Sequence, residues 1–165
     1  IEQPLTKLSN FSTDMRNRGI VPGAQVVSMS VIPATNPVAS QLRIDTGEEV
    51  LELVRVRTAN GEPMAIERSC LVYSQVRALY GMDMENVSLY QMLEDVCGLK
   101  LVKAIQTIEI AAIRPDEASM LDIGQHDAVM LIERTTYTEG ADRPVEYVIS
   151  LYRGDRYMFS IELNV

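Results

Sequence analysis

Segments rich in β-branched residues alternate along the chain with short amphipathic segments. We predict strands where apolar side chains recur with a period near two, and helices where they recur every three to four residues. This pattern predicts strands over residues 26–32, 49–57, 64–71, 105–110, 128–137 and 145–152. Short helices, each with a proline near the first turn, are predicted over residues 36–42 and 114–121.

Two further helices are predicted outside this alternation. Residues 88–97 carry apolar side chains at the period of an amphipathic helix, and a glycine follows them. Residues 9–19 form the other helix, with Ser9 and Ser12 as candidate N-terminal caps. Together the elements predict an α+β fold, in which helices pack against a mainly antiparallel sheet of about six strands.

The strand pattern occurs twice in the chain. When the sequence is shifted by 79 residues, residues 26–73 align without a gap on residues 105–152, with nine identities. Each copy has the order strand, short helix, strand, turn, strand, and each turn contains a glycine suited to a hairpin. We therefore expect this internal pseudo-repeat to form a pseudo-symmetric sheet, with a cleft where the two halves meet.

Three polar residues recur at the same spacing in both copies. An arginine is followed after twelve residues by a glutamate, and after six more by a tyrosine. These residues are Arg55, Glu67 and Tyr73 in the first copy, and Arg134, Glu146 and Tyr152 in the second. We interpret Arg134 and Tyr73 as structural residues of the duplicated framework, in an ion pair or on a sheet face.

Arg57 has no counterpart in the second copy, where Thr136 takes the equivalent position. Arg55 and Arg57 lie two residues apart on one predicted strand, so their side chains share a face, and the valines between and before them face the core. Two guanidinium groups on one face repel unless an anion or carboxylates lie between them. One interpretation is a phosphate site built from both arginines and the start of the first helix. The alternative is ion pairing with Glu52, Glu67 or Glu146.

Composition and charge narrow the function. The 165 residues carry a net charge of −8, whereas a nucleic-acid-binding surface needs clustered lysine and arginine. The two cysteines lack metal-ligand spacing and there is one histidine, so we expect no metal site and no cysteine–histidine catalytic pair. No apolar run is long enough for a membrane span. We expect a cytoplasmic domain that does not itself bind DNA or a membrane.

Several short strings agree in order and spacing with a known family. They are FSTDMRNRG (11–19), LVRVR (53–57), GEPMAIE (61–67), SLY (88–90), RPVE (143–146) and YRGDRY (152–157). Over residues 4–162 the chain resembles the UTRA domain, the ligand-sensing module of HutC-type repressors in the GntR superfamily. The resemblance implies a chorismate-lyase-like fold and one sensing domain over residues 1–165. The family's winged helix-turn-helix DNA-binding domain is expected ahead of Ile1 and is absent from this chain.

The resemblance also implies the residues of a binding site. Family members that sense amino-sugar phosphates hold the phosphate against the start of the first helix and an arginine pair. The matching residues are Phe11 and Ser12, through backbone N–H groups, with Arg55, Arg57, Ser88 and Tyr90. A carboxylate pair and a tyrosine hold the sugar hydroxyls and the acyl-amino group, which matches Glu67, Glu146 and Tyr152. The implied effector is N-acetylglucosamine-6-phosphate or glucosamine-6-phosphate, with another sugar phosphate as the second choice.

By resemblance, the whole protein would be a homodimeric repressor that releases operator DNA when the effector changes the spacing of its two DNA-reading heads. Three alternatives stay open: a different small anionic effector, a dimerisation module with a vestigial pocket, or an enzyme with Glu67 and Glu146 as general acid and base. No nucleophile, metal cluster or cofactor loop accompanies these carboxylates. We therefore expect an effector-sensing domain that is not an enzyme and has no catalytic residues and no cofactor.

Overall fold

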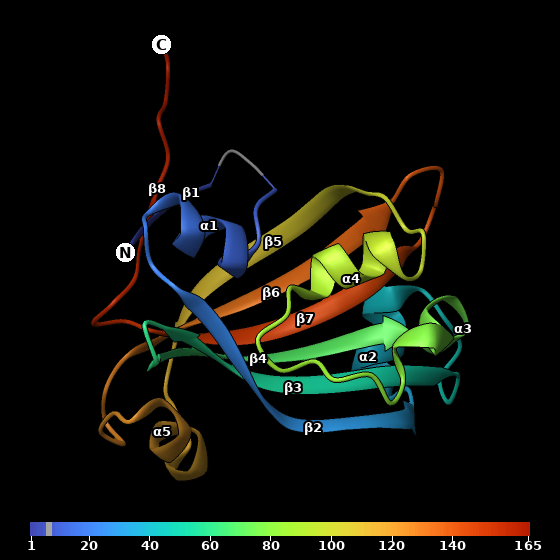
Figure 1. The fold of residues 1–165 in the computed structure, drawn as a ribbon, viewed down its shortest axis with the longest axis horizontal. Helices are drawn as coiled ribbons and strands as arrows, with labels where there is room; N and C mark the ends of the chain where they lie inside the picture. The colour runs from blue at the N-terminus through green and yellow to red at the C-terminus, as the bar shows by residue number, and fades with distance from the viewer. Residues whose placement is uncertain (6–7) are drawn as a thin grey trace.

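A six-stranded antiparallel sheet forms the centre of the computed structural model, which describes residues 1–5 and 8–165 (Figure 1). The strand order is β2-β3-β4-β7-β6-β5. The bounds are β2 (Pro22–Pro33), β3 (Glu49–Ala59), β4 (Glu62–Val72), β5 (Leu101–Ala111), β6 (Val129–Thr138) and β7 (Pro144–Arg153). The predicted six-stranded sheet is confirmed, and every strand end lies within four residues of its predicted place. Thr6, within the stretch that resembles the family, lies outside the described residues.

The 79-residue repeat is visible in this sheet. β2, α2 (Asn36–Leu42), β3 and β4 form one half, and β5, α5 (Pro115–Leu121), β6 and β7 form the other. The strand order is symmetric about the β4–β7 pair. Both helices end at equivalent residues in the left-handed conformation, Arg43 at φ 54° and Asp122 at φ 55°. The pseudo-symmetric sheet predicted from the repeat is confirmed.

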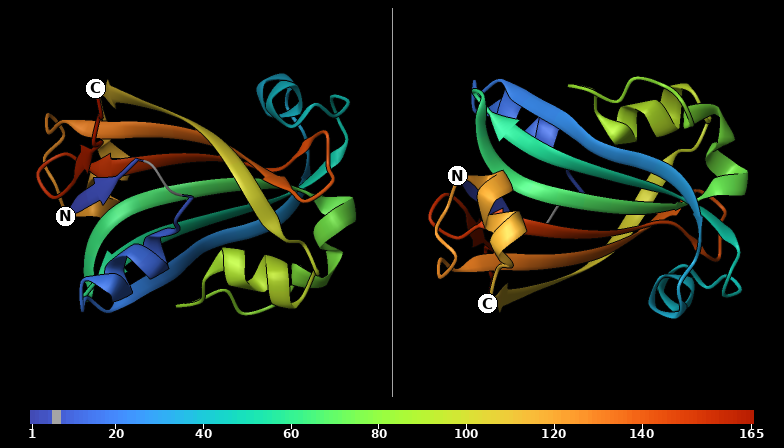
Figure 2. Two further views of the ribbon diagram at one scale, coloured as in Figure 1. Left: turned by 90° about the horizontal axis from the view of Figure 1, so that it is seen from above. Right: turned by 90° about the horizontal axis from the view of Figure 1, so that it is seen from below.

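Helices cover both faces of the sheet, with α2 and α4 on opposite sides of it in Figure 2. α2 and α5 lie on one face, and each packs on a strand of the other half: α2 on β7, and α5 on β4. Val54 and Val56 join Leu121 in the core of this face, as predicted for the residues next to the arginines. The opposite face carries α1 (Phe11–Asn17), α4 (Leu89–Asp95) and both arginines of β3.

The predicted helix at 88–97 is confirmed as α4, which Ser88 caps. Leu89 and Leu93 point into the core, but Val96 is 39% exposed because the helix ends before it. The sequence did not predict α3 (Tyr73–Val76), since four residues are too few to show a helical period. All helices in the described part of the chain have seven residues or fewer, and none could cross a membrane.

α1 begins later than predicted, and neither Ser9 nor Ser12 caps it. The cap is Asn10, whose side-chain oxygen accepts a hydrogen bond from the backbone N–H of Thr13 at 2.9 Å. The Ser9 hydroxyl instead donates to Asp14 at 3.0 Å, and Ser12 lies within the first turn. The prediction was wrong because serine and asparagine cap helices about equally well, so a run of such residues does not locate the cap.

A second, two-stranded sheet joins the two ends of the chain. β1 (Glu2–Pro4) pairs in parallel with β8 (Met158–Ser160). The Ile1 amino group also donates to the Arg156 carbonyl at 2.7 Å. Three-residue strands carry no usable periodicity, so this sheet was not predicted. It places the first residues of the chain beside the segment that follows β7 (Figure 1).

Candidate functional site

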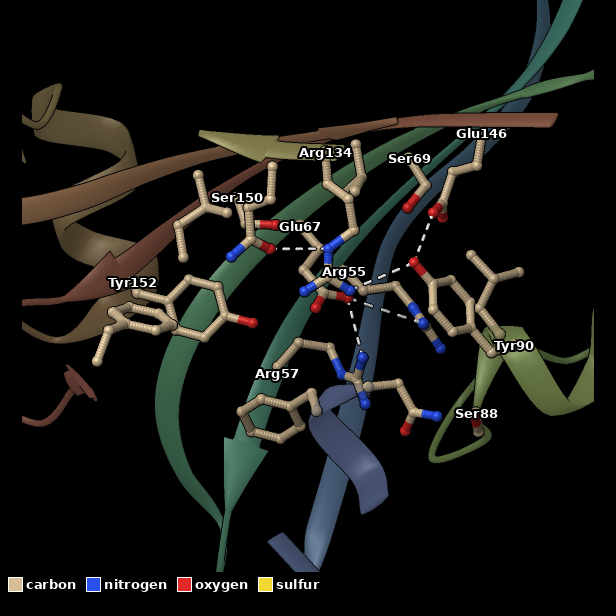
Figure 3. A pocket seen from close by; sticks show the side chains of 17 residues that line it. Arg55, Arg57, Glu67, Ser69, Ser88, Tyr90, Arg134, Glu146, Ser150 and Tyr152 are labelled. Atoms are coloured by element: carbon tan, nitrogen blue, oxygen red, sulfur yellow. Dashed lines mark hydrogen bonds and ion pairs between the residues drawn. The ribbon is translucent and has the colours of Figure 1, made fainter. Parts of the chain in front are cut away.

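A pocket opens on the arginine-bearing face of the sheet, between α1 and α4 (Figure 3). The space between its side chains, counted together with the open solvent at its mouth, is about 570 Å³. Its lining includes eight of the nine predicted site residues: Phe11, Arg55, Arg57, Glu67, Ser88, Tyr90, Glu146 and Tyr152. The ninth, Ser12, is buried beside the pocket and accepts a hydrogen bond from Arg57. The fold therefore brings together residues that lie up to 141 positions apart.

Arg57 lies on the pocket floor and is held from several sides. It donates to Glu67 at 2.9 Å, to the Ser12 hydroxyl at 2.8 Å and to the Gly23 carbonyl at 3.4 Å. Its guanidinium also lies over the Phe11 ring, 4.6 Å from the ring centroid, an arrangement that favours the cation. A guanidinium has five N–H donors, so Arg57 keeps donors for a ligand after making these contacts.

Arg55 is more deeply buried than Arg57, and its contact with the Glu67 carboxylate is longer. It is 2% exposed and donates to the backbone carbonyls of Val87 at 2.8 Å and Met84 at 3.3 Å. Burial, aided by the charge of Arg57, lowers the pKa of Arg55 to about 10, so it carries its charge at neutral pH.

One carboxylate serves both arginines. Glu67 Oε2 lies 2.9 Å from Arg57 and 3.9 Å from Arg55. Of the other two carboxylates considered, Glu52 pairs with Arg68 on the opposite face, and Glu146 contacts hydroxyl groups. The ion-pair interpretation is thus correct for Glu67. Two arginines with one carboxylate still leave a net positive charge that an anion can neutralise.

The two glutamates of the pocket have opposite electrostatic environments. Burial raises the pKa of Glu67, but the Arg57 and Arg55 guanidiniums outweigh it and hold the pKa below the usual carboxyl value. Burial also raises the pKa of Glu146, and there the Tyr90 hydroxyl and the Arg134 charge offset it only in part. Glu67 is therefore an ionised acceptor, whereas Glu146 takes up a proton more readily.

A difference in strand register explains this contrast. Glu67 lies opposite Arg55 in the β3–β4 pair. Glu146 lies opposite Thr136, and not opposite Arg134, the repeat equivalent of Arg55. The second hairpin is offset by two residues relative to the first, so its glutamate faces the one position where the repeat replaced an arginine with threonine. In the same pocket, one glutamate therefore has a charged cross-strand partner and the other has a neutral one.

We expect Glu146→Gln to stabilise the domain at pH 7. Both hydrogen bonds to Glu146, from Tyr90 at 3.0 Å and from Thr136 at 3.1 Å, end on one oxygen, Oε1, which glutamine retains. The native pKa is raised above the ordinary value of 4.5, so the carboxylate destabilises the native state at pH values above its native pKa. The stability gain of the variant should shrink as pH falls and vanish below about pH 4.5. Urea denaturation at several pH values measures this.

Glu67→Gln is the control of opposite sign. The native pKa of Glu67 is lowered, so its carboxylate stabilises the fold at neutral pH, and this contribution is lost as pH falls through the native pKa. The variant should be less stable than the wild type at pH 7, and the difference should narrow in acid. If both variants shift stability in the same direction at pH 7, the assignment of opposite environments is wrong.

Arg134 lies in the pocket wall. The sequence had predicted a structural role for it and not a place in the site. It donates to the Gln106 side chain at 2.8 Å and to the Tyr90 hydroxyl at 3.4 Å. Its equivalence to Arg55 in the repeat could have indicated a place in the pocket. Its partners Gln106 and Tyr90, however, come from separate elements that only the fold brings close to Arg134. Tyr73 lies in α3 outside the pocket lining, beside Arg77, in agreement with a structural role.

Aromatic rings form the pocket wall away from α4. The Tyr152 ring packs edge-on against Tyr157, with centroids 4.6 Å apart, and Phe159 of β8 joins the lining. The Tyr152 hydroxyl points toward the arginines and Glu67 (Figure 3). Within residues 1–5 and 8–165, no group of histidine, cysteine and carboxylate side chains could hold a metal ion. The site offers forked guanidinium donors for an anionic group. Its carboxylate and hydroxyl groups can hydrogen-bond to the polar groups of the same ligand, and the aromatic rings add apolar faces.

Comparison with known proteins identifies the family. The UTRA domain model matches residues 17–158. The chain belongs to the UTRA domain family. The HTH-type transcriptional repressor NagR of Bacillus subtilis is 34% identical over 159 residues, which cover 96% of this chain and 65% of that protein. The HTH-type transcriptional repressor PhnF of Mycolicibacterium smegmatis is 29% identical over 164 residues, 99% of this chain and 66% of that protein.

The UTRA chain described here spans slightly less than two thirds of the length of these two relatives. The effector domain of PhnF from Mycobacterium smegmatis superimposes with a TM-score of 0.92 at 28% identity, with both chains fully covered. The ligand-binding domain of a GntR-family transcriptional regulator from Bordetella bronchiseptica gives a TM-score of 0.78 at 25% identity, covering 87% of this chain and 92% of that one. The predicted family and the chorismate-lyase-like α+β fold are confirmed. The relatives are transcriptional regulators and not enzymes, which confirms the prediction that this domain is not an enzyme.

Proposed function

We propose that this UTRA domain senses a phosphorylated amino sugar, such as N-acetylglucosamine-6-phosphate or glucosamine-6-phosphate, within a dimeric bacterial repressor. The observation that supports it best is the pocket floor, where Arg55 and Arg57 share the single carboxylate of Glu67. A phosphate of charge near −2 would neutralise the remaining positive charge. It would also accept charge-assisted hydrogen bonds from the forked guanidiniums.

The starts of two helices lie beside these arginines. The backbone N–H groups of Phe11 and Ser12 lie in the first turn of α1, where a helix leaves such groups without an internal partner. Ser88 lies at the start of α4, and its hydroxyl accepts from Gln91 at 3.4 Å while keeping its own proton to donate. We assign the phosphate to this end of the pocket.

The sugar would occupy the other end of the pocket. Glu67 is an ionised acceptor for a sugar hydroxyl, whereas the Glu146 carboxyl, with its raised pKa, can also donate to an acyl oxygen when protonated. The Tyr152 hydroxyl adds a further partner at this end, whereas the Tyr90 hydroxyl, which accepts a hydrogen bond from Arg134 at 3.4 Å, is assigned with Ser88 to the phosphate. A phosphate at one end and several hydroxyl and amide partners at the other fit an amino-sugar phosphate better than a simple carboxylic acid.

The pocket also contacts the segment that leads into α1. Arg134 donates to the Ser9 carbonyl at 3.1 Å, so an effector that binds near Arg134 would change the restraint on this segment. In the repressor, a winged helix-turn-helix ahead of this segment would bind operator DNA. We propose that effector binding favours a dimer in which the two DNA-reading heads no longer match the half-sites, and that the operator is then released.

Calorimetry on the domain tests the effector. N-acetylglucosamine-6-phosphate or glucosamine-6-phosphate should bind with a micromolar or lower Kd, and unphosphorylated N-acetylglucosamine should bind far more weakly. Mass spectrometry after prolonged incubation should recover the sugar phosphate unchanged. If no amino-sugar phosphate binds at micromolar concentration, this effector class is wrong. Tight binding of another anion would then identify a different effector class.

A further inference from the structure

We propose that Asn86 is a positioning residue of the effector pocket: it fastens the loop of residues 84–87 to β2, and this attachment holds both pocket arginines in place. The inference rests on the proposed function for the identity of the ligand. The contacts that carry it join protein groups only, so they can be tested without any ligand.

The 84–87 loop supplies the acceptors of Arg55. The Val87 carbonyl at 2.8 Å and the Met84 carbonyl at 3.3 Å both receive hydrogen bonds from Arg55 Nη1. Arg55 is 2% exposed, and its nearest carboxylate oxygen, on Glu67, is 3.9 Å away. Its orientation therefore depends on two backbone carbonyls of a loop, and these point at the guanidinium only while the loop lies across the sheet.

Asn86 attaches this loop to the free edge of the sheet. β2 is an edge strand, and within the described part of the chain no strand pairs with its outer side. There the Ala24 N–H donates to Asn86 Oδ1 at 3.1 Å, and the Asn86 N–H donates to the Ala24 carbonyl at 2.9 Å. The Glu85 side chain accepts from the N–H of Val26 at 2.8 Å. Asn86 thus pairs with Ala24 at two points, as a residue of a further strand would.

The attachment lies level with the arginines. Ala24 is the cross-strand partner of Arg57, and the preceding Gly23 accepts a hydrogen bond from Arg57 Nε at 3.4 Å. A Cβ at Gly23 would lie 2.3 Å from Thr58 Oγ1 and 3.1 Å from Asn86 Oδ1. A side chain at this position would clash with Thr58 and would crowd the Asn86 side chain, so glycine suits the close approach of Asn86 to β2. The same short stretch of β2 therefore contacts the loop on one side and Arg57 on the other.

Asparagine suits this position for two reasons. The backbone of Asn86 has φ 56°, in the left-handed region, which asparagine, aspartate and glycine adopt more readily than other residues. Its side chain also supplies the acceptor for Ala24. Glycine would keep the backbone but lose the acceptor, and aspartate would keep both. The loop continues directly into Ser88 and α4, which carries Tyr90, so the attachment also sets the position of the pocket's opposite wall (Figure 3).

Three variants test the proposal. Asn86→Gly removes the side-chain acceptor and keeps the backbone conformation, and Asn86→Asp restores the acceptor. Asn60→Gly is the matched control, because Asn60 has φ 50° and makes the same two bonds, to the N–H and the carbonyl of Val21, at 2.9 Å each. Asn60 lies in the β3–β4 turn, outside the pocket lining.

The first readout needs no ligand. Arginine side-chain NMR measures how fast the guanidinium protons of Arg55 and Arg57 exchange with water, with the signals assigned from Arg55→Lys and Arg57→Lys variants. We expect faster exchange in Asn86→Gly, and wild-type rates in Asn86→Asp and Asn60→Gly. A general loss of stability would accelerate exchange in both glycine variants, so the comparison separates positioning from a structural role.

The second readout is the Kd for N-acetylglucosamine-6-phosphate. Asn86→Gly should raise it roughly tenfold if the arginines keep their binding arrangement about a tenth of the time. Asn60→Gly and Asn86→Asp should stay within about twofold of the wild type, since neither leaves the Ala24 N–H without an acceptor. The Kd for unphosphorylated N-acetylglucosamine, measured by competition, should change little in any variant.

Wild-type guanidinium exchange in Asn86→Gly would overturn the proposal, and so would equal effects in Asn86→Gly and Asn60→Gly. If the wild-type domain binds no sugar phosphate, the proposed effector is wrong, but the exchange comparison still decides whether Asn86 positions the arginines. The two proposals therefore fail in different experiments.

Discussion

Replacing Arg57 with alanine should weaken binding of N-acetylglucosamine-6-phosphate by about 10- to 150-fold, which corresponds to the ~1.5–3 kcal/mol of a hydrogen bond to a charged group. Arg57 is the arginine nearest to Glu67, at 2.9 Å, and without it Glu67 would keep only the 3.9 Å contact with Arg55. The phosphate would then be repelled by the Glu67 carboxylate, which Arg57 no longer neutralises. Calorimetry of the variant and the wild type under the same buffer conditions measures the loss.

Arg68→Ala is the matched control for this charge change. Arg68 lies on β4, pairs with Glu52 on the opposite face of the sheet at 3.3 Å, and is 44% exposed. Its removal changes the net charge as Arg57→Ala does, but it leaves the pocket intact, so the Kd should remain that of the wild type. Unchanged affinity in Arg57→Ala, or equal losses in both variants, would place the phosphate away from the arginine pair.

The largest loss of stability is expected from the two leucines at the ends of α2 and α5. Leu42 and Leu121 are equivalent in the repeat and are both 0% exposed. Leu42 packs near Tyr147 of β7, and Leu121 packs near Ile66 of β4. Truncation of either to alanine should lower the free energy of unfolding by about 2–5 kcal/mol, the range for buried leucine. Urea denaturation followed by circular dichroism measures both.

Met120→Ala on α5 controls for changes in helix propensity. Met120 is the neighbour of Leu121 but is 38% exposed, so its truncation should cost less than about 1 kcal/mol. Because each helix packs on strands of both halves, Leu42→Ala and Leu121→Ala should each keep a single unfolding transition. Two separate transitions would show that the halves are independent units, contrary to the packing described above.

Most of the sheet could be predicted from the sequence because its signals are local. The strand segment 49–57 is rich in β-branched and other apolar residues, a hairpin turn separates it from 64–71, and the repeat supports the second copy. The two-residue offset between the hairpins could not be predicted, since it depends on the longer turn between Thr138 and Pro144, whereas both hairpins have a bulge at the equivalent position. The β1–β8 pair could not be predicted either, since its strands are too short to show a period.

The pocket was predictable only in part, because only some of its residues belong to a local pattern in the sequence. The repeat identified Arg55, Glu67 and Glu146, and the resemblance to the family added the helix starts and Tyr90. Gln106 was missed because its side chain is oriented by Arg134, 28 residues away in the sequence. Asn86 was missed because it acts through the backbone of β2, 62 residues away. A residue that acts by holding another in place leaves no local pattern in the sequence.

The packing of each short helix on strands of the other half affects how the chain can fold during synthesis. α2 is complete at Leu42, but β7, which covers it, begins at Pro144, about 100 residues later. At about 5–20 residues per second, the ribosome needs roughly 5–20 s to supply the missing strand. During that time the apolar side of α2 has no cover from β7, so the first half must be kept from aggregating until the second copy is translated.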